Sequence, residues 1–356
     1  MRRTIMVAAA AALTSLALTG CMVANPGGPA VTPSAQATSS VPAASPNTPQ
    51  PQTDADEYTL VQEPEDGFTP IYDLITSAKT SIEMTMYELE DPTATADLIA
   101  AAHRGVKVRV ILDRDFAGAK ANADAYSQLQ AGGVQVDWAA SDTIYHQKTI
   151  TVDGTVSAIG TANLTSQYYT TTRDAWIIDR NQAQVYAIEQ TFDNDFGVTK
   201  DTGASAQAPG ILWSPDAQAS MVASISAAKT SVDFTSEELS DSAVAAALEQ
   251  DARRGVTCEI VMTKDSDYYP ELGAAEQAGC QVHLFPDSEK DLYMHEKIVL
   301  TDGSNLLIGS QNASVSSLTY NRELSVELTS QNAPSVVTDV LTTFNADFAD
   351  APAWSE

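Results

Sequence analysis

The chain has 356 residues, of which 44% are hydrophobic and 19% are charged, a composition typical of a globular protein of about two domains. Its 47 acidic side chains against 19 lysines and arginines leave a formal net charge of −28. A surface this acidic repels polyphosphates at long range, so nucleic acid is disfavoured as a partner. Three cysteines exclude a disulfide-dense small protein and a multi-cysteine zinc array.

The N-terminus has the layout of a bacterial export signal. Arg2 and Arg3 precede an apolar run over 5–18, which is too short for a membrane span and ends in Leu-Thr-Gly-Cys at Cys21. This ending resembles the lipobox of bacterial lipoproteins. The resemblance implies that residues 1–20 are a signal peptide and that Cys21 is lipidated; the alternative is an ordinary cleaved signal with a chance cysteine.

A lipidated first residue predicts the location of the mature protein. A diacylglyceryl group carries two acyl chains, which is enough for stable anchoring. We therefore expect the protein in the cell envelope, lipid-anchored on the extracytoplasmic face of the bacterial membrane. Residues 21–57 hold seven of the sixteen prolines and many alanines, serines and threonines, with no charged side chain before Asp54. Such a segment cannot bury a core, which predicts a disordered tether.

The remainder of the chain repeats itself. Residues 78–91 recur as 228–241, and residues 102–112 recur as 252–262, both displaced by 150 residues. This regularity indicates the duplication of one unit. The expected parts are a first half, a linker and a second half, over 58–200, 201–209 and 210–352.

Within each half, strand and helix patterns alternate. In chain order the first half predicts a helix opened by Thr69-Pro70, a strand at 82–86, a helix from Asp91-Pro92 to Gly105, strands at 106–112 and 134–140, and a hairpin over 148–160. In the second half, Ser214-Pro215 opens the matching helix and Asp302-Gly303 begins the matching hairpin turn. This alternation predicts an α/β fold of two halves with mostly parallel sheets.

Two cysteines fall on strands expected to be successive in the second half. Cys258 and Cys280 could form a disulfide in an exported protein. The alternative is two small buried thiols, because cysteine also packs well in hydrophobic cores.

One polar motif occurs at equivalent places in both halves. His146, Lys148 and Asp153 form H-x-K-x-x-x-x-D, and the same pattern recurs in the second half with His295, Lys297 and Asp302. Further polar residues keep step: Asn163 and Asn312 each lie 17 residues after the motif histidine, and Asp174 and Glu323 each lie 28 residues after it. A lone copy would indicate a surface histidine beside a lysine, but two copies in register indicate a function.

The duplicated motif fits the chemistry of a phosphate diester. On a strand, residues i and i+2 point to the same face, so each histidine shares a face with its lysine, while the aspartate lies at the turn. A duplicated fold can bring both faces to one pseudo-twofold axis. Ammonium groups and carboxamides there would hold the non-bridging oxygens. One neutral histidine can attack phosphorus and the other, protonated, can protonate the leaving oxygen. The clusters lack a closed set of metal ligands, so neither metal nor cofactor is expected.

With both motifs in one polypeptide, the chain resembles the phospholipase D superfamily over about 58–350, and its motifs are the "HKD" motifs of that family. The resemblance implies a duplicated phospholipase D-like fold and a covalent phosphohistidine that is resolved by water or an alcohol. It implies that His146 is the nucleophile and His295 the general acid and base. The remaining implied roles are phosphoryl binding by Lys148, Lys297, Asn163 and Asn312, histidine orientation by Asp174 and Glu323, and loop stabilisation by Asp153 and Asp302.

The first half departs from the family pattern in two places. The family's G-S-x-N becomes Gly160-Thr161-Ala162-Asn163, and its Asn-x-Glu becomes Thr172-Arg173-Asp174, whereas the second half keeps both patterns. Threonine still supplies a hydroxyl and aspartate a shorter carboxylate. We therefore expect activity, with an altered orientation of His146.

The superfamily includes phospholipases, phospholipid synthases and nucleases, and the fold does not choose among them. Lipid anchoring favours a membrane phospholipid as substrate. The expected function is phospholipase D-type hydrolysis of a glycerophospholipid to phosphatidate and free headgroup, with transphosphatidylation as a side reaction. The alternatives are a secreted endonuclease of the same superfamily and a non-catalytic, tethered phospholipid-binding lipoprotein. Because the duplication supplies both half-sites, a monomer is sufficient.

Overall fold

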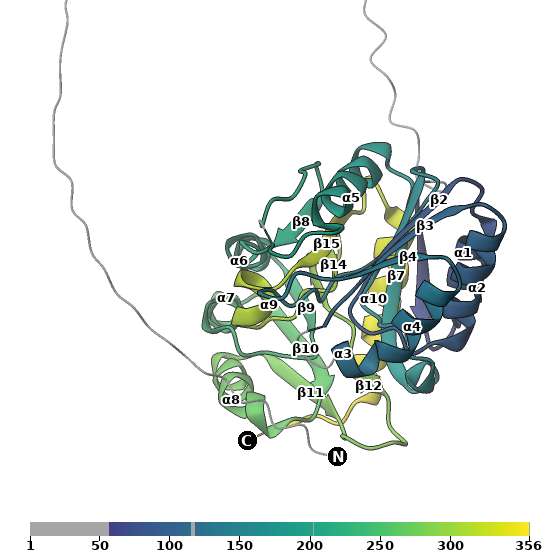
Figure 1. Cartoon of the computed structure of the whole chain (residues 1–356). Helices are drawn as coiled ribbons and strands as arrows, with labels where there is room; N and C mark the ends of the chain where they lie inside the picture. The colour runs from purple at the N-terminus through teal and green to yellow at the C-terminus, as the bar shows by residue number, and fades with distance from the viewer. Residues whose placement is uncertain (1–56, 115–117, 202, 356) are drawn as a thin grey trace, which may run out of the picture. The chain divides into compact units, whose positions relative to one another are not determined.

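The computed structural model describes residues 57–114, 118–201 and 203–355 (Figure 1). The expected signal peptide, Cys21 and the tether up to residue 56 lie outside the described residues. No helix of the described part is both long and apolar enough to cross a membrane.

The first half alternates strands and helices in the expected order. Its strands are β1 (Tyr58–Glu63), β2 (Ser81–Met86), β3 (Lys107–Leu112), β4 (Gln135–Trp138), β5 (Lys148–Val152), β6 (Val156–Gly160) and β7 (Thr172–Asp179). Its helices are α1 (Thr69–Ser77), α2 (Pro92–His103), α3 (Gly118–Ala121), α4 (Ala123–Ala131) and α5 (Gln182–Asp195), with a short 3₁₀ turn, η1 (Ser166–Tyr168).

The second half repeats this order. Its strands are β8 (Ile211–Ser214), β9 (Ser231–Thr235), β10 (Thr257–Thr263), β11 (Gln281–Phe285), β12 (Tyr293–Met294), β13 (Ile298–Thr301), β14 (Asn305–Gly309) and β15 (Glu323–Thr329). Its helices are α6 (Gln218–Ser226), α7 (Ser242–Arg253), α8 (Tyr269–Ala278), α9 (Val315–Thr319) and α10 (Pro334–Asp350), with a 3₁₀ turn, η2 (Ser266–Tyr268).

Each half contributes one large sheet, which confirms the duplicated α/β fold. The strand orders are β1-β7-β6-β5-β2-β3-β4, with β12 of the second half added beside β7, and β11-β10-β9-β13-β14-β15-β8. The sheets are mixed, and the expectation of mostly parallel sheets is wrong in this respect. Strands joined by helices, such as β2 and β3, pair in parallel, but the tight turn after β5 forces β5 and β6 to pair antiparallel.

The helix start predicted at Asp91 is confirmed, because Asp91 caps α2 by accepting hydrogen bonds from two backbone N–H groups. Asp241 caps α7 of the second half in the same way. Two other predicted helix starts differ from the observed ones. Thr69 is already the first residue of α1, with Phe68 as its cap, and Ser214 ends β8, so that α6 begins only at Gln218.

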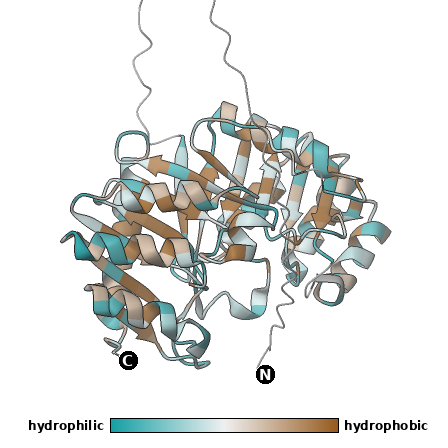
Figure 2. Cartoon of the chain, turned by 90° about the vertical axis from the view of Figure 1, so that its left-hand side faces the viewer, coloured by the Kyte–Doolittle hydropathy of each residue, from teal (hydrophilic) through white to brown (hydrophobic). Residues whose placement is uncertain are grey.

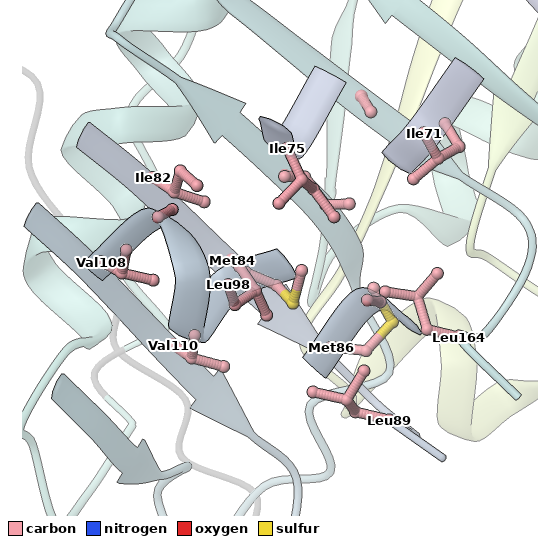
Figure 3. Packing of buried hydrophobic residues seen from close by; sticks show 14 of the residues in the cluster. Ile71, Ile75, Ile82, Met84, Met86, Leu89, Leu98, Val108, Val110 and Leu164 are labelled. Atoms are coloured by element: carbon pink, nitrogen blue, oxygen red, sulfur yellow. The ribbon is translucent and has the colours of Figure 1, made fainter. Parts of the chain in front are cut away.

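The described part of the chain has four hydrophobic clusters, and the three largest hold these layers together. One lies between the first sheet and helices α1, α2 and α4, where Ile75, Met84 and Leu98 interlock (Figure 3). A second lies between the other sheet and helices α6, α7 and α8. The third joins residues of both sheets with α5 and α10, and so fuses the two halves. Figure 2 shows hydrophobic residues gathered on the strands, as expected for sheets covered by such cores.

Cys258 of β10 and Cys280, which precedes β11, form a disulfide with a Cα–Cα distance of 4.6 Å. The disulfide ties an edge strand of the second sheet to its neighbour. Of the two alternatives left by the sequence, the structure therefore has the disulfide.

Candidate active site

The two motif segments each cross to the opposite half. Just before β5, the backbone N–H of Gln147 donates to the carbonyl of Arg322 at 3.0 Å. Just before β13, the N–H of Glu296 donates to the carbonyl of Arg173 at 2.8 Å, and β12 pairs in parallel with β7. Because Arg322 and Arg173 directly precede Glu323 and Asp174, this pairing brings each motif histidine to the carboxylate of the other half.

The histidine–carboxylate pairs are accordingly crossed. His146 Nδ1 lies 2.9 Å from Glu323 Oε2, and His295 Nδ1 lies 2.8 Å from Asp174 Oδ1. All four residues are buried. A carboxylate at Nδ1 holds the proton there and leaves Nε2 as the nitrogen available for chemistry. Each half-site is thus completed only by the other half of the chain.

Each motif lysine contacts the backbone of the histidine two residues before it. Lys148 Nζ donates to the carbonyl of His146 at 2.6 Å, and Lys297 Nζ donates to the carbonyl of His295. Burial, followed by the charge of Lys297, lowers the pKa of Lys148 to about 7. The two ammonium groups therefore act on one another across the pseudo-twofold axis, and an anion placed between them would relieve their repulsion.

The first half-site favours a neutral imidazole. Burial lowers the pKa of His146 to about 4, although Glu323 acts in the opposite direction. Burial tends to raise the pKa of Glu323, but its contact with His146 holds that pKa below its ordinary value. At neutral pH the pair is therefore a carboxylate beside a neutral imidazole whose Nε2 carries a lone pair, which is the state of a nucleophile.

The two motif asparagines occupy similar places but have different surroundings. Asn312 is buried; its Oδ1 accepts from Ser236 Oγ at 3.3 Å, and its Nδ2 lies 3.5 Å from Glu237 Oε2. Asn163 is partly buried, and within the described part of the chain its Oδ1 has no hydrogen-bond partner. The Asn163 carboxamide is thus less constrained than that of Asn312.

The motif aspartates lie at the hairpin turns, away from the histidines. Asp153 accepts hydrogen bonds from the backbone N–H groups of Lys79, Thr80 and Ser81. Asp302 accepts from the equivalent residues of the second half, Lys229, Thr230 and Ser231. Both aspartates have φ of 54°, in the left-handed region that aspartate tolerates in turns. Their contacts tie the α1–β2 and α6–β9 connections to the motif hairpins.

The departures in the first half still supply the family's polar groups. Thr161 Oγ1 donates to Asp174 Oδ1 at 2.6 Å, so the shorter carboxylate reaches both the hydroxyl and His295. In the second half, Glu323 uses separate oxygens, Oε2 for His146 and Oε1 for Ser317 and Asn321. These departures predict an altered orientation of His146. The structure places Asp174, the carboxylate that departs from the pattern, against His295 instead.

One residue of the site was missed in the sequence. Glu237, which follows β9, lies with Oε2 3.3 Å from His295 Nε2 and 3.5 Å from Lys297 Nζ. Its equivalent in the first half is Tyr87, whose ring is 4.6 Å from the His146 ring and 5.0 Å from Lys148 Nζ. The repeat displacement of 150 residues aligns these two positions, so the mismatch could have been found by comparing the halves.

Two buried arginines beside the site carboxylates were also missed. Arg173 and Arg322 each precede a site carboxylate, and each reaches an acidic side chain on a helix of the opposite half.

Within the described residues, no group of three or more histidines, cysteines or acidic residues could hold a metal ion.

Both halves of the chain are similar to known proteins. A family model for the PLD-like domain of cardiolipin synthase matches residues 71–196 and 221–348, which together make up more than half of the chain. Mitochondrial cardiolipin hydrolase of Xenopus tropicalis is 31% identical over 127 residues, which is 36% of this chain and 60% of that protein. Cardiolipin synthase A of Proteus mirabilis is 24% identical over 315 residues, which is 74% of this chain and 63% of that protein.

Solved structures share the fold. Phosphatidylserine synthase of Haemophilus influenzae aligns with a TM-score of 0.67 at 12% identity, covering 85% of this chain and 88% of that one. Polyphosphate kinase of Porphyromonas gingivalis aligns with a TM-score of 0.64 at 14% identity, covering 82% of this chain and 50% of that one. Because the family model matches both halves of the repeat and each half carries the same motif, the chain belongs to the phospholipase D superfamily of phosphodiester-acting enzymes.

Proposed function

We propose that the protein is a phospholipase D-type phosphodiesterase that hydrolyses glycerophospholipids to phosphatidate and free headgroup. The crossed pairs His146–Glu323 and His295–Asp174 are the observation that carries this proposal. They leave Nε2 available on two imidazoles with different surroundings, and the carboxylate of Glu237 interacts electrostatically with both histidines. A two-step displacement at phosphorus requires two such imidazoles in one pocket.

In the first step, His146 Nε2 attacks phosphorus. A bond forms between nitrogen and phosphorus, and the bond from phosphorus to the headgroup oxygen breaks. His295 gives its proton to that oxygen, so the headgroup leaves as a neutral alcohol. Glu323 stabilises the positive charge that develops on His146, because it already accepts from Nδ1 at 2.9 Å.

In the second step, His295 takes a proton from water, and the water oxygen attacks phosphorus and displaces His146 Nε2. The products are phosphatidate and the regenerated site. Through both steps Lys148 and Lys297 stabilise the charge on the non-bridging oxygens, and Asn163 and Asn312 donate hydrogen bonds to them. The low pKa of His146 makes it a good leaving group in this step.

Three observations support a phospholipid as the substrate. Two relatives are named for cardiolipin, one as a hydrolase and one as a synthase. The net charge of −28 disfavours long nucleic acids. The lipobox-like sequence ending at Cys21 would place the site near lipid headgroups, lipid-anchored on the extracytoplasmic face of the membrane.

A second candidate is the transfer of the phosphatidyl group to an alcohol instead of to water. It is supported by the names of the synthase relative and of the structural neighbour, phosphatidylserine synthase. Chemically the transfer differs only in the second step, where His295 takes the proton from an alcohol. Adding a primary alcohol to the hydrolysis assay separates the two reactions by the product formed.

The proposal is tested with the purified full chain, EDTA, and mixed micelles of phosphatidylcholine, phosphatidylethanolamine or cardiolipin. Headgroup release is expected from the wild type and from His103→Ala, an exposed histidine on α2, and is expected to be lost in His146→Ala and His295→Ala. A nitrophenyl phosphodiester, whose leaving group departs without a proton, should restore the first step in His295→Ala, seen as a burst of nitrophenolate, but not in His146→Ala. Cleavage of DNA with untouched lipid would overturn the phospholipase proposal.

A further inference from the structure

One position that follows β2 in the first half and β9 in the second carries side chains of different charge in the two half-sites. In the first half Tyr87 faces His146 and Lys148 with an uncharged ring. In the second half Glu237 faces His295 and Lys297 with a carboxylate. The pseudo-symmetric site is thus electrically asymmetric at this pair of positions.

Glu237 contacts the groups of the second half that the proposed mechanism uses. Its Oε2 is 3.3 Å from His295 Nε2, 3.5 Å from Lys297 Nζ and 3.5 Å from Asn312 Nδ2. In the proposed mechanism Lys297 and Asn312 hold the non-bridging oxygens, and His295 protonates the leaving oxygen. The other oxygen, Oε1, accepts from the hydroxyl of Tyr293 at 2.9 Å. The side chain is 27% exposed, so the position can be reached from solvent.

The carboxylate remains charged in this position. Burial acts to raise the pKa of Glu237, but His295 and Lys297 hold that pKa well below its ordinary value. A phosphate that enters the site therefore meets one permanent negative charge beside the cations. That charge repels an incoming dianion about twice as strongly as a monoanion at the same place, because Coulomb energy is proportional to charge.

We propose that Glu237 is a specificity-determining residue that admits monoanionic phosphodiesters and rejects dianionic phosphomonoesters. A diester carries one negative charge, whereas a monoester, with a second pKa near 6, carries about two at pH 8. In this respect the inference rests on the proposed function: phosphatidate, the product of hydrolysis, is a monoester. Glu237 therefore weakens product binding relative to substrate binding and speeds release.

The test uses methyl phosphate and dimethyl phosphate, two soluble probes that differ by one methyl group and one charge. Their dissociation constants are measured by calorimetry at pH 8 with the full chain. In Glu237→Gln, which keeps the size of the side chain, we expect methyl phosphate to bind about tenfold more tightly and dimethyl phosphate about threefold more tightly. Glu237→Asp, which keeps the charge, should retain the preference for the diester.

The matched control is Glu238→Gln, which removes the same charge one residue along. Among the described residues Glu238 makes no hydrogen bond or ion pair with His295 or Lys297 and acts on Lys297 only through space, so the ratio of the two dissociation constants should stay within about twofold of the wild-type ratio. Equal tightening of both probes in Glu237→Gln would show that Glu237 only blocks the site. Weaker binding of both would show that it supports the lysines. Either result overturns the inference.

Failure of this inference and failure of the proposed function are distinguishable. The probe measurement needs no turnover. A shifted ratio of the two dissociation constants without lipid hydrolysis would support the specificity role of Glu237 and contradict the phospholipase proposal. Lipid hydrolysis with an unchanged ratio would support the phospholipase proposal and contradict the specificity role. In an active enzyme, phosphatidate should also become a stronger product inhibitor of Glu237→Gln than of the wild type, while KM for the diester changes less.

Discussion

At the scale of single residues, the two site carboxylates are used differently. Asp174 Oδ1 alone accepts from both His295 Nδ1 and Thr161 Oγ1, whereas Glu323 divides its contacts between two oxygens. On its Nδ1 side, His295 therefore shares one carboxylate oxygen with Thr161. This makes Asp174 the more sensitive of the two positions.

Asp174→Asn is expected to lower kcat by roughly 10²–10⁴-fold, because an amide neither fixes the Nδ1 proton nor balances the imidazolium charge of His295. The melting temperature should change little, since asparagine has the same size. Steady-state kinetics on a soluble diester measures the effect. Thr161→Ser, which keeps the hydroxyl, is the control and should leave kcat nearly unchanged; an active Asp174→Asn enzyme would exclude the proposed role of this carboxylate.

A second residue-scale prediction concerns stability against pH. Glu296 is buried next to His295, and Oε1 has no hydrogen-bond partner within the described residues. Burial raises its pKa from 4.5 to about 8, although Arg173 acts against the shift. Below pH 4.5 the carboxyl is protonated in both folded and unfolded chains. As pH rises toward 8, only the unfolded chain releases the proton, so folding stability is lost across this window.

Glu296→Gln should therefore stabilise the fold by roughly 2 kcal/mol at pH 8 and by almost nothing at pH 4. Glutamine is a natural choice, because Gln147 stands at the equivalent place in the first half. Urea denaturation at the two pH values gives the free energies of unfolding. Glu289→Gln, on an exposed loop, is the control. Equal effects at both pH values would show that packing, and not ionisation, determines the result.

At the scale of elements, two buried ion pairs join each half to the other. Arg173 of β7 makes a bidentate contact with Asp347 of α10, through Nε at 2.7 Å and Nη2 at 2.9 Å. Arg322, just before β15, makes the same contact with Asp195 of α5, at 2.8 Å and 2.9 Å. Each arginine directly precedes a site carboxylate, so these pairs fix the strands that position Asp174 and Glu323.

Removing one partner leaves a buried charge without compensation. Asp195→Asn is expected to destabilise the fold by about 3 kcal/mol, and the double variant Asp195→Leu with Arg322→Met should recover much of this loss. Urea denaturation measures both. The exposed pair Arg253–Glu249 on α7 is the matched control, and Glu249→Gln there should cost less than about 1 kcal/mol. A loss of similar size in Glu249→Gln would contradict the special role of the buried pairs.

The elements also show how far the sequence alone can predict this protein. The repeat, the hairpins turning at Asp153 and Asp302, and the order of the elements over 69–160 follow from sequence patterns, whereas β1, α4, β7 and α5 of the first half were not predicted. The crossing of His146 to Glu323 and of His295 to Asp174 does not follow from such patterns, because it depends on pairing between segments more than a hundred residues apart. Glu237 was not predicted because the repeat identifies residues that the two halves share, and the equivalent position in the first half is Tyr87.

At the scale of the whole molecule, the active site and the fold are completed by the same contacts. Each half supplies a histidine to one half-site and a carboxylate to the other, and the third hydrophobic core contains residues of both sheets. A single half would therefore lack both a complete site and a cover for its inner face. One chain contains all these parts, which is why we expect a monomer to be active.

The last prediction concerns the anchor, which is argued from sequence alone. In cells that express the full chain, the wild type is expected in the membrane fraction and Cys21→Ser in the soluble fraction, because two acyl chains suffice for anchoring. Turnover of a soluble diester should be equal, since the proposed catalytic residues lie between 146 and 323. Hydrolysis of membrane phospholipid should fall by roughly 10²-fold without the anchor, because the effective concentration at the surface is lost. If both forms are soluble, Cys21 follows an ordinary cleaved signal, and the enzyme must reach its lipid by diffusion.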